Sequence, residues 1–307
     1  MQHTAVEALD DEAIARCLRG AFDLNCRCAP TAPGYALDPA EAAEEALALG
    51  MGGLVFRDEG YCTAPVASLL AETWFRDEPI SLSGSVALNN ISGDVNFYAA
   101  EHALALGGRI VSMPTLSAQN HLRNARWPAF GREDGMPAPR AITAVDERGN
   151  VTFEAVEVLD VVAERDGVLD AGALHVSEVL PLFEEALRRG VKRLLMSDPV
   201  QRNGAQALDI EEALDLGAVV EFLPQRREGD APLIELVAMT APERLILGLD
   251  IGPREERTTL RERYSTAIRH WASLGLPLPT ITAGMSSNVR AAVAFPPLGI
   301  RRTGELA

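Results

Sequence analysis

Short apolar segments alternate with helical patterns along almost the whole chain. The apolar segments have the length of β-strands and lie at 21–28, 53–58, 80–88, 109–115, 168–172, 191–198, 218–223 and 244–250. Strands that alternate with helices form parallel sheets, and eight such units at this chain length favour a closed (β/α)₈ barrel, an α/β fold. The alternative is an open doubly wound sheet. No glycine-rich nucleotide motif follows the first strand, which gives a nucleotide-binding fold little support.

The chain is expected to form a single domain over residues 1–307, with a long insertion after the fourth strand at 116–153. Its first part is rich in proline and glycine, whereas 141–154 resembles a β-hairpin that turns at 148–150. Long segments of this kind either cover active sites or are disordered. One expectation is therefore a lid in which Trp127 and Phe130 cover a ligand, and the alternative is a disordered segment.

Composition narrows the choice of partners. Acidic residues outnumber basic ones by 44 to 28, a formal net charge of −16, which disfavours binding to nucleic acid and to anionic membranes. The N-terminal segment lacks the pattern of a signal peptide, and no apolar run approaches the ~20 residues of a transmembrane helix. Four cysteines are too few for a disulfide scaffold, so a cytoplasmic location is expected.

In a (β/α)₈ barrel, functional residues lie in the loops after the strands. Alternate strand residues share a face, so Asp23, Asn25 and Arg27 are expected to point into the barrel mouth together. Asp58 and Glu59 follow the second strand beside Arg57, and the two like charges would raise the pKa of one carboxyl toward neutrality. The alternative for this pair is a solvated turn.

Later strand ends supply further candidates. As acid or base groups we expect Asp198 and Asp250, although an aspartate at such a position often caps a helix. His121 and His175 lie on the same side and could transfer protons. For hydrogen bonding to a substrate the candidates are Asn89 and Thr115. The mouth loops also carry many arginines, which indicates a preference for an anionic small molecule.

Three segments carry a resemblance to a known family. They are ALNNISGDVNFYAAEHALALGGRIVSMPT (87–115), GVLDAGALHVSEVLPLFEEALRRGVKRLLMSDP (167–199) and the closing MSSNVRAAVAFPPLGI. The order of these segments and their residue motifs resemble those of the amidohydrolase superfamily of metal-dependent barrel hydrolases. The resemblance extends over about residues 22–288. The resemblance implies one or two divalent metals, held by an H-x-H pair on the first strand, histidines after later strands and an aspartate after the eighth.

This chain departs from that pattern at nearly every ligand position. Asn25 and Arg27 stand at the H-x-H pair, and Glu59 or Asp58 stands at the histidine position after the second strand. Ala173, two residues before His175, stands at the histidine position after the fifth strand, and Asp198 at the one after the sixth. Of the implied ligands only Asp250 matches. The guanidinium of Arg27 cannot ligate a cation. The single lysine, Lys192, begins the sixth strand at the opposite end of the barrel, so it cannot reach a metal at the mouth. No zinc site is therefore expected.

The resemblance and the altered ligands together predict a small-molecule enzyme that works without a metal, of hydrolase, lyase or isomerase type, in specialised metabolism. Asp198, Asp250 and Glu59 would supply acid–base chemistry, with Arg27 and Arg57 stabilising negative charge. One alternative is a non-catalytic homologue that binds a ligand or partner. Another is a hydrolase whose magnesium or manganese is held by Asp23, Glu59, Asp198 and Asp250. A homodimer is expected by analogy with similar barrels.

Overall fold

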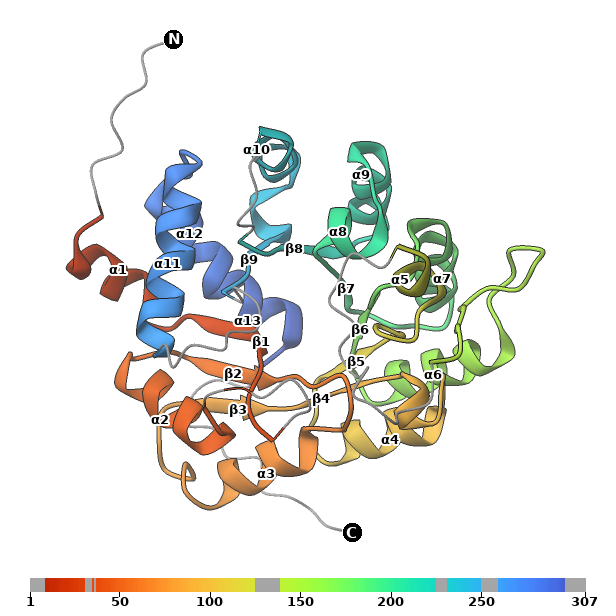
Figure 1. Ribbon diagram of the computed structural model, residues 1–307, viewed down its shortest axis with the longest axis horizontal. Helices are drawn as coiled ribbons and strands as arrows, with labels where there is room; N and C mark the ends of the chain where they lie inside the picture. The colour runs from red at the N-terminus through yellow and green to blue at the C-terminus, as the bar shows by residue number, and fades with distance from the viewer. Residues whose placement is uncertain are drawn as a thin grey trace.

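The computed structural model describes residues 9–30, 35, 37–124, 139–224, 231–249 and 259–295. Its strands lie at the centre and its helices around them, as in a (β/α)₈ barrel (Figure 1). All the strand ladders are parallel, and they run in two sheets, β1-β2-β3 and β4-β5-β6-β7-β8-β9. The strands are β1 (Phe22–Cys26), β2 (Gly53–Phe56), β3 (Ser81–Ser83), β4 (Ser85–Ala87), β5 (Ile110–Ser112), β6 (Val168–Asp170), β7 (Leu194–Ser197), β8 (Val219–Phe222) and β9 (Leu245–Leu247).

The third predicted strand is interrupted at Gly84, which separates β3 from β4. A Cβ atom at Gly84 would lie 2.4 Å from the backbone nitrogen of Ala64, at the start of the helix that precedes β3. Only glycine fits so close to that backbone. The two ladders therefore meet at one continuous segment of chain, which counts as one of eight strand positions in the barrel.

Helices follow the strands in the predicted order and form the outer layer. They are α1 (Asp11–Leu18), α2 (Pro39–Ala48), α3 (Ala64–Glu72), α4 (Phe97–Ala105), α5 (Gln119–Asn124), α6 (Phe153–Glu164), α7 (Val176–Arg188), α8 (Pro199–Asn203), α9 (Ala207–Asp215), α10 (Ala231–Met239), α11 (Leu260–Ser273), α12 (Leu278–Met285) and α13 (Ser287–Val293). Asp38 caps α2 and forms a capping box with Glu41, and Pro39 occupies the first helical turn. No helix in the described part of the chain is long and apolar enough to cross a membrane.

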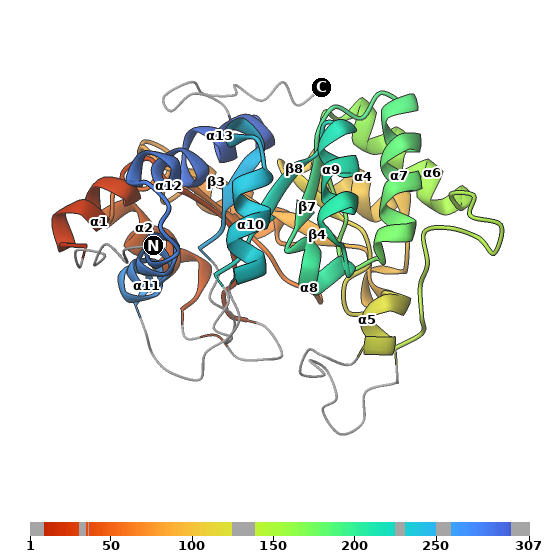
Figure 2. The ribbon, with the colours of Figure 1, turned by 90° about the horizontal axis from the view of Figure 1, so that it is seen from above.

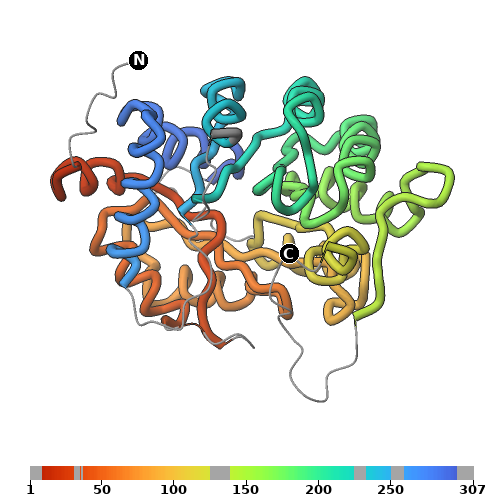
Figure 3. Tube along the Cα trace, turned by 45° about the horizontal axis from the view of Figure 1, so that its top comes forward, coloured from red at the N-terminus to blue at the C-terminus, as the bar shows by residue number. Residues whose placement is uncertain are grey.

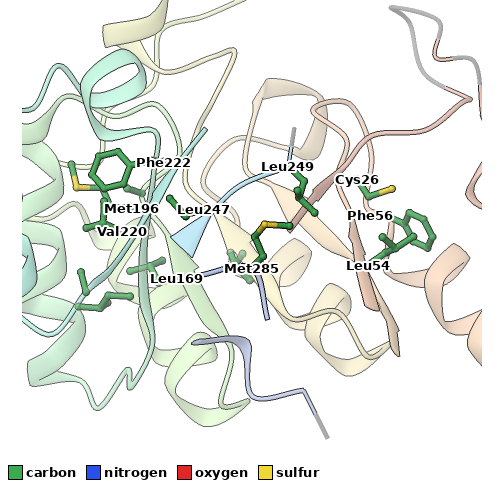
Figure 4. Packing of buried hydrophobic residues seen from close by; sticks show 14 of the residues in the cluster. Cys26, Leu54, Phe56, Leu169, Met196, Val220, Phe222, Leu247, Leu249 and Met285 are labelled. Atoms are coloured by element: carbon green, nitrogen blue, oxygen red, sulfur yellow. The ribbon is translucent and has the colours of Figure 1, made fainter. Parts of the chain in front are cut away.

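Two apolar layers enclose the strands. The larger one lies between strands and helices and includes Cys26, Leu54 and Phe56, which point away from the barrel axis (Figure 4). The smaller one fills the barrel interior, where Val289 and Val293 of α13 join residues of the strands. The rings of Phe22 and Phe295 stack there at 5.0 Å. Helix α13 thus closes one end of the barrel, and the other end is left for a site.

That other end carries the short helices α5 and α8, opposite α13 (Figure 2). The first helix lies beside two of the last ones, because α1 contacts α11 and α12 (Figure 3). Helices α5, α8 and α12 were not predicted, because the proline- and glycine-rich sequence around them hides their periodicity. The predicted hairpin is reduced to a turn closed by one antiparallel bridge between Val145 and Val151. Trp127 and Phe130 of the expected lid lie outside the described residues.

Candidate functional site

A β-bulge in the first strand decides which residues enter the barrel. The register between β1 and β2 shifts between Asp23 and Cys26, so Leu24 and Asn25 both face inward. Asp23 turns outward, where its Oδ2 atom accepts a hydrogen bond of 2.8 Å from the hydroxyl of Tyr264 on α11. The prediction that Asp23 lies beside Asn25 and Arg27 in the mouth was therefore wrong. A bulge changes the alternation on which that prediction relied.

A buried polar layer spans the barrel just above its apolar interior, and Arg57 is its cation. The guanidinium donates to Asn25 Oδ1 at 2.9 Å, Ser112 Oγ at 2.9 Å and Asp170 Oδ2 at 2.7 Å. The Asp170 carboxylate is fully buried, and its Oδ1 atom has no hydrogen-bond partner among the described residues. The charge of Asp170 is therefore balanced chiefly by Arg57. This places Arg57 below the open pocket, as a support for it.

Glu221 of β8 extends the same layer. Its carboxyl oxygens accept hydrogen bonds from Asn25 Nδ2 at 2.8 Å and from Ser197 Oγ at 2.6 Å, and the side chain is fully buried. Burial raises the pKa of Glu221 above its ordinary value, against the opposing effects of these hydrogen bonds and of Arg57 and Arg202. Glu221 is thus the carboxyl group in the barrel whose neutral form the fold favours.

Above this layer lies an open pocket whose polar wall is an ion pair. Arg27 Nη2 donates to Glu59 Oε1 at 2.9 Å, and both side chains are largely buried. The second oxygen, Glu59 Oε2, accepts a hydrogen bond from the hydroxyl of Thr115. Asn89 fixes this group, since its Nδ2 donates to Thr115 Oγ1 at 2.7 Å and to the main-chain oxygen of Glu59 at 3.0 Å. Arg27, Glu59, Asn89 and Thr115, all predicted from sequence, therefore form one cluster.

The free space between these side chains is small, about 20 Å³, and opens to solvent. His121 of α5 and Arg202 of α8 complete its polar lining, and Leu116 and Ala173 form its apolar side. Arg202 was noted in the sequence only as one of many arginines. The helix that carries it was not predicted, and no sequence pattern distinguished it from the others.

The surroundings of this pocket lower the pKa of both Glu59 and His121, so both groups favour their deprotonated forms. Burial raises the pKa of Glu59, but Arg27, Arg202, Arg57 and the hydrogen bond from Thr115 lower it below its ordinary value. Glu59 is therefore not the member of the Asp58 and Glu59 pair whose pKa is raised, because the guanidiniums outweigh burial. Burial also lowers the pKa of His121, and Arg202 adds to this while Glu59 opposes it. At neutral pH the pocket thus holds an ionised carboxylate and a neutral imidazole.

Other predicted residues lie outside this pocket lining. His175 is exposed and caps α7, where its Nδ1 atom accepts a hydrogen bond of 3.2 Å from Ser177 N. Asp58 accepts from the backbone nitrogen of Gly60 at 2.6 Å, the turn contact that was the alternative for this segment. Asp198 is buried at the start of α8 with a φ of 52° and makes no side-chain cap. Asp250 lies outside the described residues.

Asp170 and Glu221 are the site residues that sequence reasoning missed. Each is an acidic residue within an otherwise apolar strand segment, VLD and VVEF. A charged group inside a buried strand is rarely tolerated without a partner, so this pattern was a usable signal. The sequence could not name the partner, because Arg57 is 113 positions away from Asp170.

The donor set does not suit the divalent metals that the superfamily resemblance implies. In the described part of the chain, no three His, Cys, Asp or Glu side chains come together as a metal site would require. The oxygens of Asn25, Ser112 and Asp170 that face the centre are already bound to Arg57. Asp23, a member of the alternative magnesium or manganese set, points to α11. The guanidiniums of Arg27 and Arg57 place permanent positive charge here.

Comparison with known structures agrees with the barrel. An amidohydrolase from Pseudomonas aeruginosa superposes with a TM-score of 0.60 at 10% identity, covering 92% of this chain and 99% of that chain. The probable dipeptidase PvdM from the same organism gives 0.58 at 10% identity, with 92% and 98% covered. An amidohydrolase from Mycoplasma synoviae gives 0.55 at 13% identity, with 91% and 89% covered. The chain thus has the (β/α)₈ fold of the amidohydrolase superfamily, as the sequence resemblance predicted.

The sequence itself places the chain in a narrower group. A model of a family of unknown function, DUF6282, matches residues 20–221, about two thirds of the chain. The protein belongs to that family. No curated protein sequence matches the chain.

Proposed function

We propose that this protein is a hydrolase-type enzyme for a small molecule that works without a metal ion, by acid–base chemistry of its own side chains. The observation that carries the proposal is the ion pair of Arg27 and Glu59, which lies in the barrel mouth beside His121 and Arg202. Its fold is that of amidohydrolases, while its own residues replace the ligand set of such enzymes. The pocket lies at the face where barrel enzymes carry their chemistry.

His121 is the general base in this mechanism, since its imidazole is neutral at pH 7 and lines the pocket. It accepts a proton from water as the water oxygen bonds to the electrophilic carbon of the substrate. Glu59, ionised and held by Arg27 and Thr115, stabilises the imidazolium that forms. Arg27 stabilises the negative charge that develops on the substrate oxygen. The imidazolium then returns its proton to the leaving group as the scissile bond breaks.

This mechanism changes the roles expected from sequence. Glu59 has a lowered pKa, and its carboxylate accepts hydrogen bonds from Arg27 and Thr115. It is therefore a weak base and acts through its negative charge. Arg57 acts one layer below, where it holds Asn25 and Asp170. The pairing of both Glu59 oxygens also favours a second candidate, a non-catalytic homologue that only binds a ligand, because a fully paired carboxylate needs no catalytic role.

Two measurements test the proposal. Elemental analysis of the purified protein should find no stoichiometric zinc, iron, magnesium or manganese, and a stoichiometric metal would contradict it. Turnover on a library of chromogenic esters and amides should persist in EDTA and fall at least about 100-fold in His121→Gln, the lower range for loss of a general base. His175→Gln is the matched control, a histidine on the same side of the barrel that caps a helix. Ligand binding without any turnover would favour the second candidate.

A further inference from the structure

The pocket lining offers many more hydrogen-bond donors than free acceptors. Arg27 and Arg202 both line it, and both side chains are at most 8% exposed. A guanidinium carries five N–H groups, so each arginine can keep its protein contacts and still donate to a ligand. The carboxylate in the lining, Glu59, already accepts from Arg27 and Thr115. A ligand that supplies acceptors therefore fits this wall better than one that supplies donors.

We infer that the substrate is a small carboxylate whose carboxylate group binds Arg202, which forms its anchoring subsite in the pocket. This inference rests on the proposed function and specifies its substrate class. Guanidinium groups bind planar carboxylates through paired N–H donors.

Arg202 is well placed to serve as a fixed anchor. Its main-chain nitrogen bonds the oxygen of Asp198 at 2.9 Å, and its main-chain oxygen accepts from Asn120 Nδ2 at 2.8 Å. The same amide of Asn120 also reaches the main-chain oxygen of Ala173 at 3.1 Å. Three elements, α5, α8 and the loop after β6, thus fix the main chain at Arg202, and the side chain is 5% exposed. A fixed main chain reduces the entropy lost when the side chain binds a ligand.

The remaining walls limit the rest of the ligand. Leu116 and Ala173 offer a short apolar surface next to the charged groups, which suits a brief aliphatic stem. A phosphate monoester would bring a second negative charge close to Glu59, where like charges repel. These features favour a short carboxylate over a phosphate.

Titration calorimetry with propionate, propionamide and inorganic phosphate as probes tests the inference at constant ionic strength. Propionate should bind, and propionamide, which has nearly the same shape without the charge, should bind at least about tenfold more weakly. Arg202→Gln should weaken propionate binding about tenfold or more, and Arg202→Lys should do so in part, because lysine keeps the charge and loses the paired donors. Arg140→Gln is the control, an arginine 77% exposed that pairs with Asp94.

Equal binding of propionate and propionamide, or unchanged binding in folded Arg202→Gln and Arg202→Lys variants, would overturn the inference. Tighter binding of phosphate than of propionate would overturn the carboxylate assignment. The same titration on His121→Gln separates the two proposals. Propionate binding without turnover in any form of the protein leaves the subsite standing and rejects the hydrolase, whereas turnover of neutral esters without propionate binding does the reverse.

Discussion

The Nη2 atom of Arg57 lies 2.7 Å from Oδ2 of Asp170, and both side chains are buried inside the barrel. Arg57 follows β2 and Asp170 ends β6, so this pair links opposite parts of the strand order. Arg57 also binds Asn25, which stands at the first position of the H-x-H pair that the superfamily resemblance implies.

Removal of this charge should destabilise the fold strongly. Arg57→Ala leaves the Asp170 carboxylate buried without its ion-pair partner, a change that costs about 3–5 kcal/mol in other proteins. Urea unfolding followed by circular dichroism measures the effect. The exposed Arg165, which pairs with Glu101, provides the control, and Arg165→Ala should leave the free energy of unfolding nearly unchanged. A loss below about 1 kcal/mol for Arg57→Ala would reject the assignment of Arg57 as the balancing charge of Asp170.

Glu221 should make stability depend on pH in the direction opposite to an ordinary carboxylate. Its pKa is higher in the folded protein than in the unfolded chain, so the folded state binds more protons above about pH 4.5. The free energy of unfolding contributed by Glu221 therefore falls as the pH rises from there toward the folded pKa. Glu221→Gln, which mimics the neutral form, should lack this fall. Unfolding curves of both proteins across this pH range would show parallel stabilities if the prediction fails.

His121 should titrate below its ordinary pKa of 6.5, because it is partly buried and lies near Arg202. Two-dimensional NMR of the imidazole resonances measures this pKa directly. Arg202→Gln should raise it, and Glu59→Gln should lower it further, since these neighbours act in opposite directions. Shifts of the same sign in both variants would contradict the proposed electrostatics of the pocket.

His175 should contribute to stability and not to catalysis. Its ring accepts the hydrogen bond of a backbone nitrogen at the start of α7, and loss of such a cap costs roughly 0.5–2 kcal/mol. His175→Ala should lower the unfolding free energy by about that amount, and His175→Asn should restore most of it. Turnover per folded molecule should stay at the level of the unmodified protein in both variants. A drop in turnover with unchanged stability would return His175 to the list of catalytic candidates.

Much of this molecule follows from its sequence. The alternation of apolar segments and helical patterns determines a parallel α/β barrel, because strands buried on both faces are largely apolar. The strand ends then place Arg27, Glu59, Asn89 and Thr115 at one mouth, where the structure brings them together. The replacement of the expected H-x-H pair by Asn25 and Arg27 is also visible in the sequence.

The tertiary structure alone decided which of these groups pair and how they are charged. A bulge of the backbone turned Asp23 away from the mouth, and a contact across 113 positions joined Arg57 to Asp170. The pKa of Glu59 falls because three arginines from separate segments of the chain lie near it. Hydrogen bonds and charges act over a few ångströms in space whatever the distance along the chain, so a pattern of residue types cannot specify them before the barrel brings them together.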